Sequence, residues 1–144
     1  MSATKIKGIA DLEQIKNRYK ETVSKFSHQI LICSGAGCIS SNCADVKNAV
    51  VDEVEKHGLL DSVVVHETGC MGICAVGPVM LILPERTFYT NLTPESAQKI
   101  FKSHVLQGKI LKEFTFYDQT LNKHVPKIDD IDFFKTQVTI ALRN

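Results

Sequence analysis

The chain has 144 residues, of which 44% are hydrophobic and 23% are charged, and its formal net charge is +1. This length suits one domain with a core of its own, and the near-neutral charge gives no electrostatic case for binding nucleic acid or an anionic membrane. The first residues lack the apolar region of a secretion signal, and no stretch approaches the length of a membrane span. We therefore expect a cytoplasmic protein without membrane insertion.

The first part of the chain is predicted to hold two helices with a strand between them. Apolar residues recur at helical spacing over residues 10–26, which predicts an amphipathic helix. The apolar run 29–32 predicts a buried strand. A second helix follows, with Ser41 or Asn42 as its N-cap and Gly58 just beyond its end.

The middle of the chain is predicted to be mostly strand. Residues 62–66 predict one strand, and residues 79–83 and 87–92 predict a hairpin. Thr93 and Pro94 have the residue types of a helix N-cap and of a first helical position. A further helix is therefore expected after the hairpin.

This order of elements predicts an α/β fold. We expect a thioredoxin-like mixed sheet flanked by helices, with an N-terminal helix in residues 1–27, the sheet domain in residues 28–112 and an extended linker in residues 113–144. Ile128 and Ile131 of the last segment have no full domain to pack within. That segment is therefore expected to continue into, or dock on, something else.

Four of the five cysteines lie in two glycine-rich loops that follow predicted strands. Cys33 and Cys38 are separated by four residues, and Cys70 and Cys74 by three. The carboxyl ends of strands are the usual place for sites in α/β sheets, and clustered thiols in the cytoplasm indicate metal binding more than disulfides. A [2Fe–2S] cluster takes four ligands, so these four cysteines are its candidate ligands.

The spacing of the cysteines alone does not exclude other kinds of cysteine site. Zinc sites and thiol–disulfide enzymes usually contain pairs with two intervening residues, and [4Fe–4S] clusters usually need a closely spaced run. The observed spacing therefore favours a [2Fe–2S] cluster over zinc and over redox-active thiols. Cys43 is sterically able to replace Cys38, but we expect it to be a small apolar residue at the start of the second helix. His66 is expected to be a partly exposed strand residue, and Phe88 and Tyr89 to be core or interface residues.

The residues around both cysteine pairs resemble a known family. The resemblance rests on Ile-Cys-Ser-Gly-Ala-Gly-Cys at 32–38, Glu-Thr-Gly-Cys-Met-Gly-Ile-Cys at 67–74, and the pairs Gly77-Pro78 and Phe88-Tyr89. Over about residues 28–112 the chain resembles the thioredoxin-like [2Fe–2S] ferredoxin domain. It is most similar to the version at the N-terminus of the NADH-binding flavoprotein subunit of multimeric, electron-bifurcating iron hydrogenases and related formate dehydrogenases. The end of the chain is similar to the lead-in to the flavin domain, as in the NADH-binding subunit of complex I.

The resemblance implies a [2Fe–2S] cluster on Cys33, Cys38, Cys70 and Cys74. It also implies electron exchange with a flavin-bearing domain and with other iron–sulfur subunits. FMN and NAD(P)H are expected on the missing domain or on a partner, because no glycine-rich nucleotide loop is readable in the sequence. We expect an electron-transfer module of a cytoplasmic NAD(P)H-linked oxidoreductase, such as an iron hydrogenase, with no turnover by this chain alone. The alternative is a zinc-stabilised domain that docks subunits and has no redox role.

Overall fold

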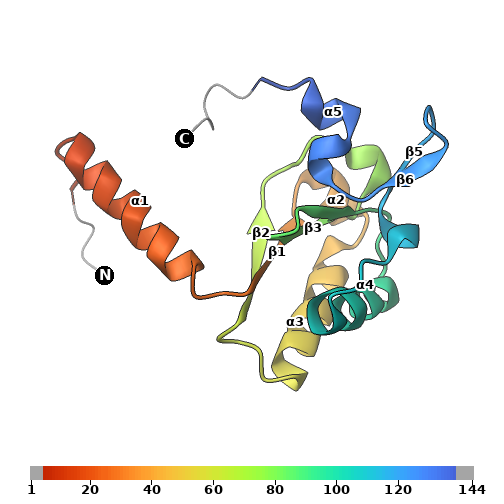
Figure 1. Cartoon of the computed structure of the whole chain (residues 1–144), viewed down its shortest axis with the longest axis horizontal. Coiled ribbons are helices and arrows are strands. Elements are labelled where there is room, and N and C mark those ends of the chain that lie inside the picture. The colour runs from red at the N-terminus through yellow and green to blue at the C-terminus, as the bar shows by residue number, and fades with distance from the viewer. Residues whose placement is uncertain (1–4, 139–144) are drawn as a thin grey trace.

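A four-stranded mixed sheet organises the chain, whose residues 5–138 are described by the computed structural model (Figure 1). Its spatial order is β2-β1-β3-β4, with β1 and β2 parallel and β3 antiparallel to both β1 and β4. The strands are β1 (His28–Cys33), β2 (Val63–Thr68), β3 (Met80–Leu83) and β4 (Thr87–Tyr89). Cys33 pairs with Thr68, the last residue of β2. The loops that leave the two parallel strands therefore start side by side.

Two helices cover one face of this sheet. They are α3 (Cys43–Lys56) and α4 (Pro94–Ile100), which continues as a π-helical turn (Phe101–Val105), and they lie next to each other (Figure 1). The predicted start of α4 is confirmed, since the Thr93 Oγ1 accepts a hydrogen bond from the Ser96 N–H at 3.2 Å. Asn42 is the N-cap residue of α3, in a left-handed backbone conformation and without a side-chain capping bond.

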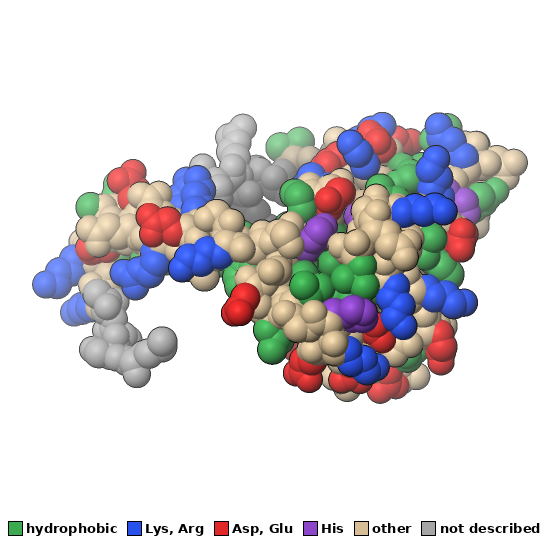
Figure 2. Space-filling view, turned by 60° about the horizontal axis from the view of Figure 1, so that its bottom comes forward, with side chains coloured by type: hydrophobic (Ala, Val, Ile, Leu, Met, Phe, Trp, Pro, Cys, Tyr) green, Lys and Arg blue, Asp and Glu red, His purple; other side chains and the backbone are tan. Residues whose placement is uncertain are grey.

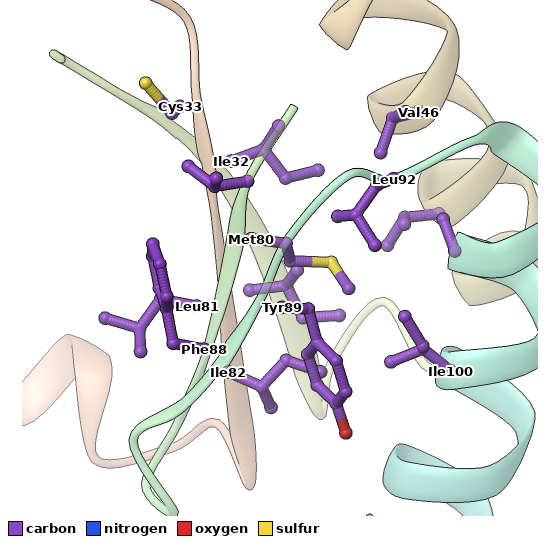
Figure 3. Packing of buried hydrophobic residues seen from close by; sticks show 14 of the residues in the cluster. Ile32, Cys33, Val46, Met80, Leu81, Ile82, Phe88, Tyr89, Leu92 and Ile100 are labelled. Atoms are coloured by element: carbon purple, nitrogen blue, oxygen red, sulfur yellow. The ribbon is translucent and has the colours of Figure 1, made fainter. Parts of the chain in front are cut away.

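The main core lies between the sheet and these helices. Tyr89 and Ile100 point into this space, whereas Phe88 and Leu81 lie on the opposite face of the sheet (Figure 3). Phe88 and Tyr89 are both fully buried, as expected for core residues. Burial of side chains of this size stabilises the fold by roughly 1.5–3 kcal/mol each.

The predicted N-terminal helix is present as α1 (Ile9–Val23), and it extends away from the sheet (Figure 1). None of its residues is buried, and Leu12 and Ile15 remain about half exposed. Figure 2 shows charged side chains spread over the same helix. In the described part of the chain, no helix combines the length and the apolar character needed to cross a bilayer.

The segment expected as an extended linker is folded in its described part. It contains a short hairpin of β5 (Phe116–Asp118) and β6 (Lys123–Val125) and a final helical turn, α5 (Asp132–Lys135). Short 3-10 turns at Lys112–Phe114 and Ile128–Asp130 connect these elements. Residues 139–144 of this prediction lie outside the described residues.

This segment packs along the outer edge of β4. The Phe88 N–H donates to the Pro126 carbonyl at 2.8 Å, and the Thr90 N–H donates to the Phe114 carbonyl at 2.9 Å. Ile131 is only 1% exposed and belongs to the same hydrophobic cluster as the sheet. The expectation that Ile128 and Ile131 have no full domain to pack within is therefore wrong, because both side chains join the hydrophobic core of the sheet domain. Whether the segment leads into a further domain stays a prediction.

Candidate metal centre

The ends of β1 and β2 deliver the four predicted ligands. Cys33 is the last residue of β1, and Cys38 lies in a short helix, α2 (Ala36–Ser40), where the sequence indicated only a loop. Cys70 follows β2, and Cys74 begins a 3-10 turn (Cys74–Val76). Since β1 and β2 are adjacent and parallel, their loops meet at one edge of the sheet.

Three glycines allow the two loops to touch. A Cβ atom built on Gly35 would lie 2.8 Å from the Cys70 Cβ, and one on Gly37 would lie 3.0 Å from the Cys74 Cβ. A Cβ on Gly77 would lie 3.0 Å from the Cys38 Sγ. The first two distances are well inside the ordinary carbon–carbon contact of about 3.5–4.0 Å, and the third is also too short for an unstrained contact with sulfur. The close approach of the two ligand loops therefore depends on the absence of side chains at these glycines.

The two cysteine pairs differ in exposure. Cys33 and Cys38 are buried, whereas Cys70 and Cys74 are exposed. The Sγ atoms of Cys70 and Cys74 are 3.6 Å apart. One pair thus lies in the protein interior, and the other lies where the site meets solvent.

Backbone groups already favour negative charge on sulfur in this region. The Gly72 N–H lies 3.3 Å from the Cys70 Sγ, to which it donates. Burial raises the pKa of the Cys33 thiol, but hydrogen bonds, chiefly from the backbone N–H groups of Gly35 and Met71, outweigh burial and bring that pKa below its ordinary value. Donors of this kind stabilise a thiolate, which is the form that binds metals.

The thiols of Cys38 and Cys74 resist ionisation beside their neighbours. Burial, followed by the hydrogen bond to Cys33 and the charge of that residue, raises the pKa of Cys38 to about 11. The hydrogen bond to Cys70 and its charge raise the pKa of Cys74. Four adjacent thiolates repel one another, and bound metal cations relieve this repulsion because they reverse the local electrostatics.

These residues fit an iron–sulfur cluster in donor type and in number. Soft thiolates bind iron–sulfur clusters and zinc, and the glycine contacts leave the ligand loops close together. Within residues 5–138, no three His, Cys, Asp or Glu side chains are arranged to hold one metal ion. The contact between the loops agrees with the predicted grouping of the cysteines, while the assignment of each thiol as a ligand stays a prediction.

Cys43 occupies the place that the sequence predicted for it. It is the first residue of α3 and is 5% exposed, as expected for a small buried residue. Burial, followed by the charge of Cys33, raises the pKa of its thiol. His66 lies within β2 and is partly buried. The choice between Cys38 and Cys43 in the ligand set stays open to experiment.

One residue beside the site was missed by the sequence analysis. The ring of Phe133, in α5, lies so close to Gly72 that a Cβ on that glycine would be 3.1 Å from the Phe133 Cζ. These residues are far apart in the sequence, and no local pattern connects them. The contact became visible only when the fold of the C-terminal segment was known.

Known proteins share both the sequence features and the fold. The family model for the thioredoxin-like [2Fe–2S] ferredoxin matches residues 3–104. A 2Fe–2S ferredoxin of Clostridium pasteurianum is 30% identical over 93 residues, which cover 59% of this chain and 91% of that protein. A putative 2Fe–2S ferredoxin of Priestia megaterium is 30% identical over 91 residues, which cover 63% of this chain and 71% of that protein.

A solved structure shows the same fold. The thioredoxin-like [2Fe–2S] ferredoxin from Aquifex aeolicus superposes with a TM-score of 0.56 at 22% identity, covering 62% of this chain and 95% of that one. The predicted thioredoxin-like α/β fold is thereby confirmed. The family match ends at residue 104, before the β5–β6 hairpin and α5.

Proposed function

The chain belongs to the thioredoxin-like [2Fe–2S] ferredoxin family, and from this we propose that it carries electrons through one [2Fe–2S] cluster held by Cys33, Cys38, Cys70 and Cys74. The observation that carries the ligand assignment is the contact between the two cysteine loops at Gly35, where a side chain would collide with Cys70. When bound, such a cluster supplies reversible electron transfer at a potential that its surroundings set.

The residues of this chain have distinct roles in the proposal. The buried pair Cys33 and Cys38 anchors the site at the end of β1 and in α2, away from water. The Gly72 N–H stabilises negative charge on the Cys70 sulfur by its hydrogen bond. The exposed pair Cys70 and Cys74 forms the side from which a redox partner reaches the site.

We place this carrier in a multisubunit, cytoplasmic NAD(P)H-linked oxidoreductase, such as an iron hydrogenase. The support is the resemblance of residues 32–38 and 67–74 to the NADH-binding subunit of such enzymes. A [2Fe–2S] cluster accepts one electron, whereas NAD(P)H gives up two as a hydride, so a flavin is needed between them. The sequence has no readable nucleotide loop. FMN and NAD(P)H would therefore be bound by a further domain or by a partner, together with other iron–sulfur subunits.

The first test is the metal content of the protein purified without oxygen. We expect iron and acid-labile sulfide in equal amounts, about two of each per chain, and an EPR signal after reduction with dithionite. Stoichiometric zinc without acid-labile sulfide would instead support the zinc-stabilised docking domain and would refute the electron carrier.

The second test concerns the source of electrons. The isolated chain is expected to bleach with dithionite but to keep its visible spectrum with NADH or NADPH, because it lacks a flavin. When a flavoprotein that oxidises NADH is added, NADH is expected to bleach the visible spectrum of the chain. Rapid bleaching by either nucleotide alone would contradict the proposed need for a flavin-bearing partner.

A further inference from the structure

The C-terminal segment beyond the family match returns to the second cysteine loop. Phe133 of α5 is placed so that a Cβ on Gly72 would lie 3.1 Å from its Cζ and 3.3 Å from its Cε1. The outer edge of the phenyl ring thus lies beside the Cα of Gly72, while Phe133 as a whole remains 44% exposed. Phe133 also lines an apolar hollow with Ile73, Cys74 and Phe116.

Gly72 connects this ring to a candidate ligand. Its backbone has a φ of 90°, a conformation that residues other than glycine rarely adopt. In this conformation its N–H donates to the Cys70 Sγ at 3.3 Å. The ring of Phe133 occupies the space where a side chain of this residue would lie, so a movement of Gly72 toward α5 must displace the ring.

The position of Phe133 is fixed from outside the loop. The neighbouring ring of Phe134 packs edge-to-face on Phe88 of β4, with 5.6 Å between ring centroids, and Phe133 packs edge-to-face on Phe134 at 5.1 Å. Arg86 and Asp129 form a two-point ion pair that joins the β3–β4 turn to the same segment. The sheet therefore holds α5, and α5 holds the ring over the loop.

We propose that Phe133 is a positioning residue for the cluster, an inference that rests on the proposed function of the chain. It keeps the Gly72 N–H directed at the Cys70 sulfur, and it limits the access of water to the exposed pair of ligands. Groups that orient a metal ligand without binding the metal typically change metal affinity by about 10–100-fold when they are replaced. The C-terminal segment thereby acts on a site whose ligands all lie in the family domain.

The test compares Phe133→Ala with Phe134→Ala in the anaerobically purified protein. Both variants remove one aromatic ring from α5, but Phe133 is the ring that lies against Gly72, whereas Phe134 packs on Phe88 of the sheet. We expect Phe133→Ala to release iron to a chelator about tenfold faster than the wild type and to change the EPR signal of the reduced protein. Phe134→Ala leaves the ring of Phe133 in place but removes its neighbour, so it is expected to lower the thermal unfolding midpoint and to change the EPR signal and the rate of iron release clearly less than Phe133→Ala.

The outcomes separate this role from the proposed function. A wild-type protein without acid-labile sulfide would refute the electron carrier and this role together. A wild type with a normal [2Fe–2S] signal, combined with a Phe133→Ala variant that has the same signal and the same rate of iron release, would overturn this role alone. Equal effects of the two variants on the EPR signal would also overturn it, because they would reflect general loosening of α5. Phe133→Leu retains an apolar side chain over Gly72 and is expected to release iron at a rate between those of the wild type and Phe133→Ala.

Discussion

Replacing Gly35 by alanine tests whether contact between the two cysteine loops is required for cluster binding. The backbone of Gly35 has a φ of −65°, which alanine adopts freely, so any effect comes from the added methyl group. That group would lie 2.8 Å from the Cβ and 3.1 Å from the Cα of Cys70. To reach an ordinary contact of about 3.5–4.0 Å, the loops must separate by roughly 0.7–1.2 Å. Metal–ligand distances vary by only about 0.2 Å, so the thiolates of Cys33 and Cys70 can no longer bind one cluster without strain.

The assay is the iron and sulfide content of the Gly35→Ala protein prepared without oxygen, together with its thermal unfolding. We expect loss of most of the cluster, and destabilisation on the scale of overpacking, about 1–3 kcal/mol. Gly69→Ala is the matched control, since it also lies next to Cys70 but has nothing within 4 Å of its Cβ position. If Gly35→Ala holds as much iron and sulfide as Gly69→Ala, the steric argument for the site is refuted.

Cys43→Ser is expected to keep iron and sulfide while Cys38→Ser loses them, because we assign the ligand role to Cys38; the opposite result of iron analysis would transfer that role to Cys43. Ile131→Ala is expected to lower the free energy of unfolding by about 2–5 kcal/mol in urea, because Ile131 is 1% exposed; a change below about 0.5 kcal/mol, as at an exposed site, would mean that the C-terminal segment unfolds separately. Burial lowers the pKa of His104, although the nearby Glu85 carboxylate opposes this effect. Below about pH 6.5 the unfolded chain therefore binds a proton that the folded chain does not. The free energy of unfolding then falls as the pH drops, by at most about 1.4 kcal/mol per pH unit. His104→Gln is expected to flatten this slope in urea unfolding measured between about pH 7 and pH 5, and an unchanged slope would show that His104 is not its source.

Local patterns were sufficient to predict the sheet and most helices. The apolar runs that became β1 and β3 are bounded by polar or glycine-rich residues, and Thr93 with Pro94 is a strong helix start whatever the rest of the chain does. The four cysteines could be grouped because they follow two strands that proved to be adjacent and parallel. Spacing alone does not decide which thiols bind, since Cys43 is also buried near the first pair.

The features that were not predicted depend on partners far away in the sequence. The short helix α2 lies in a glycine-rich stretch that predicts a loop, and it packs directly against the second cysteine loop through Gly35 and Gly37. Ile128 lies in a polar segment with no clear period, and it is buried because its backbone N–H donates to the Arg86 carbonyl and places the side chain on the sheet. The last segment pairs with the domain because β4 has a free edge. No residue pattern within the last segment indicates that edge.

The covering of β4 also has a consequence for synthesis of the protein. Phe88 on that strand and Thr90 just after it direct their N–H groups to the carbonyls of Pro126 and Phe114, which leave the ribosome later. Until then the nascent chain presents an unpaired strand edge, the kind of edge that joins with another chain. A shortened form that stops at residue 104 would keep this edge open after release. We therefore expect the shortened form to aggregate during expression, and the preparation of the protein to require the C-terminal segment.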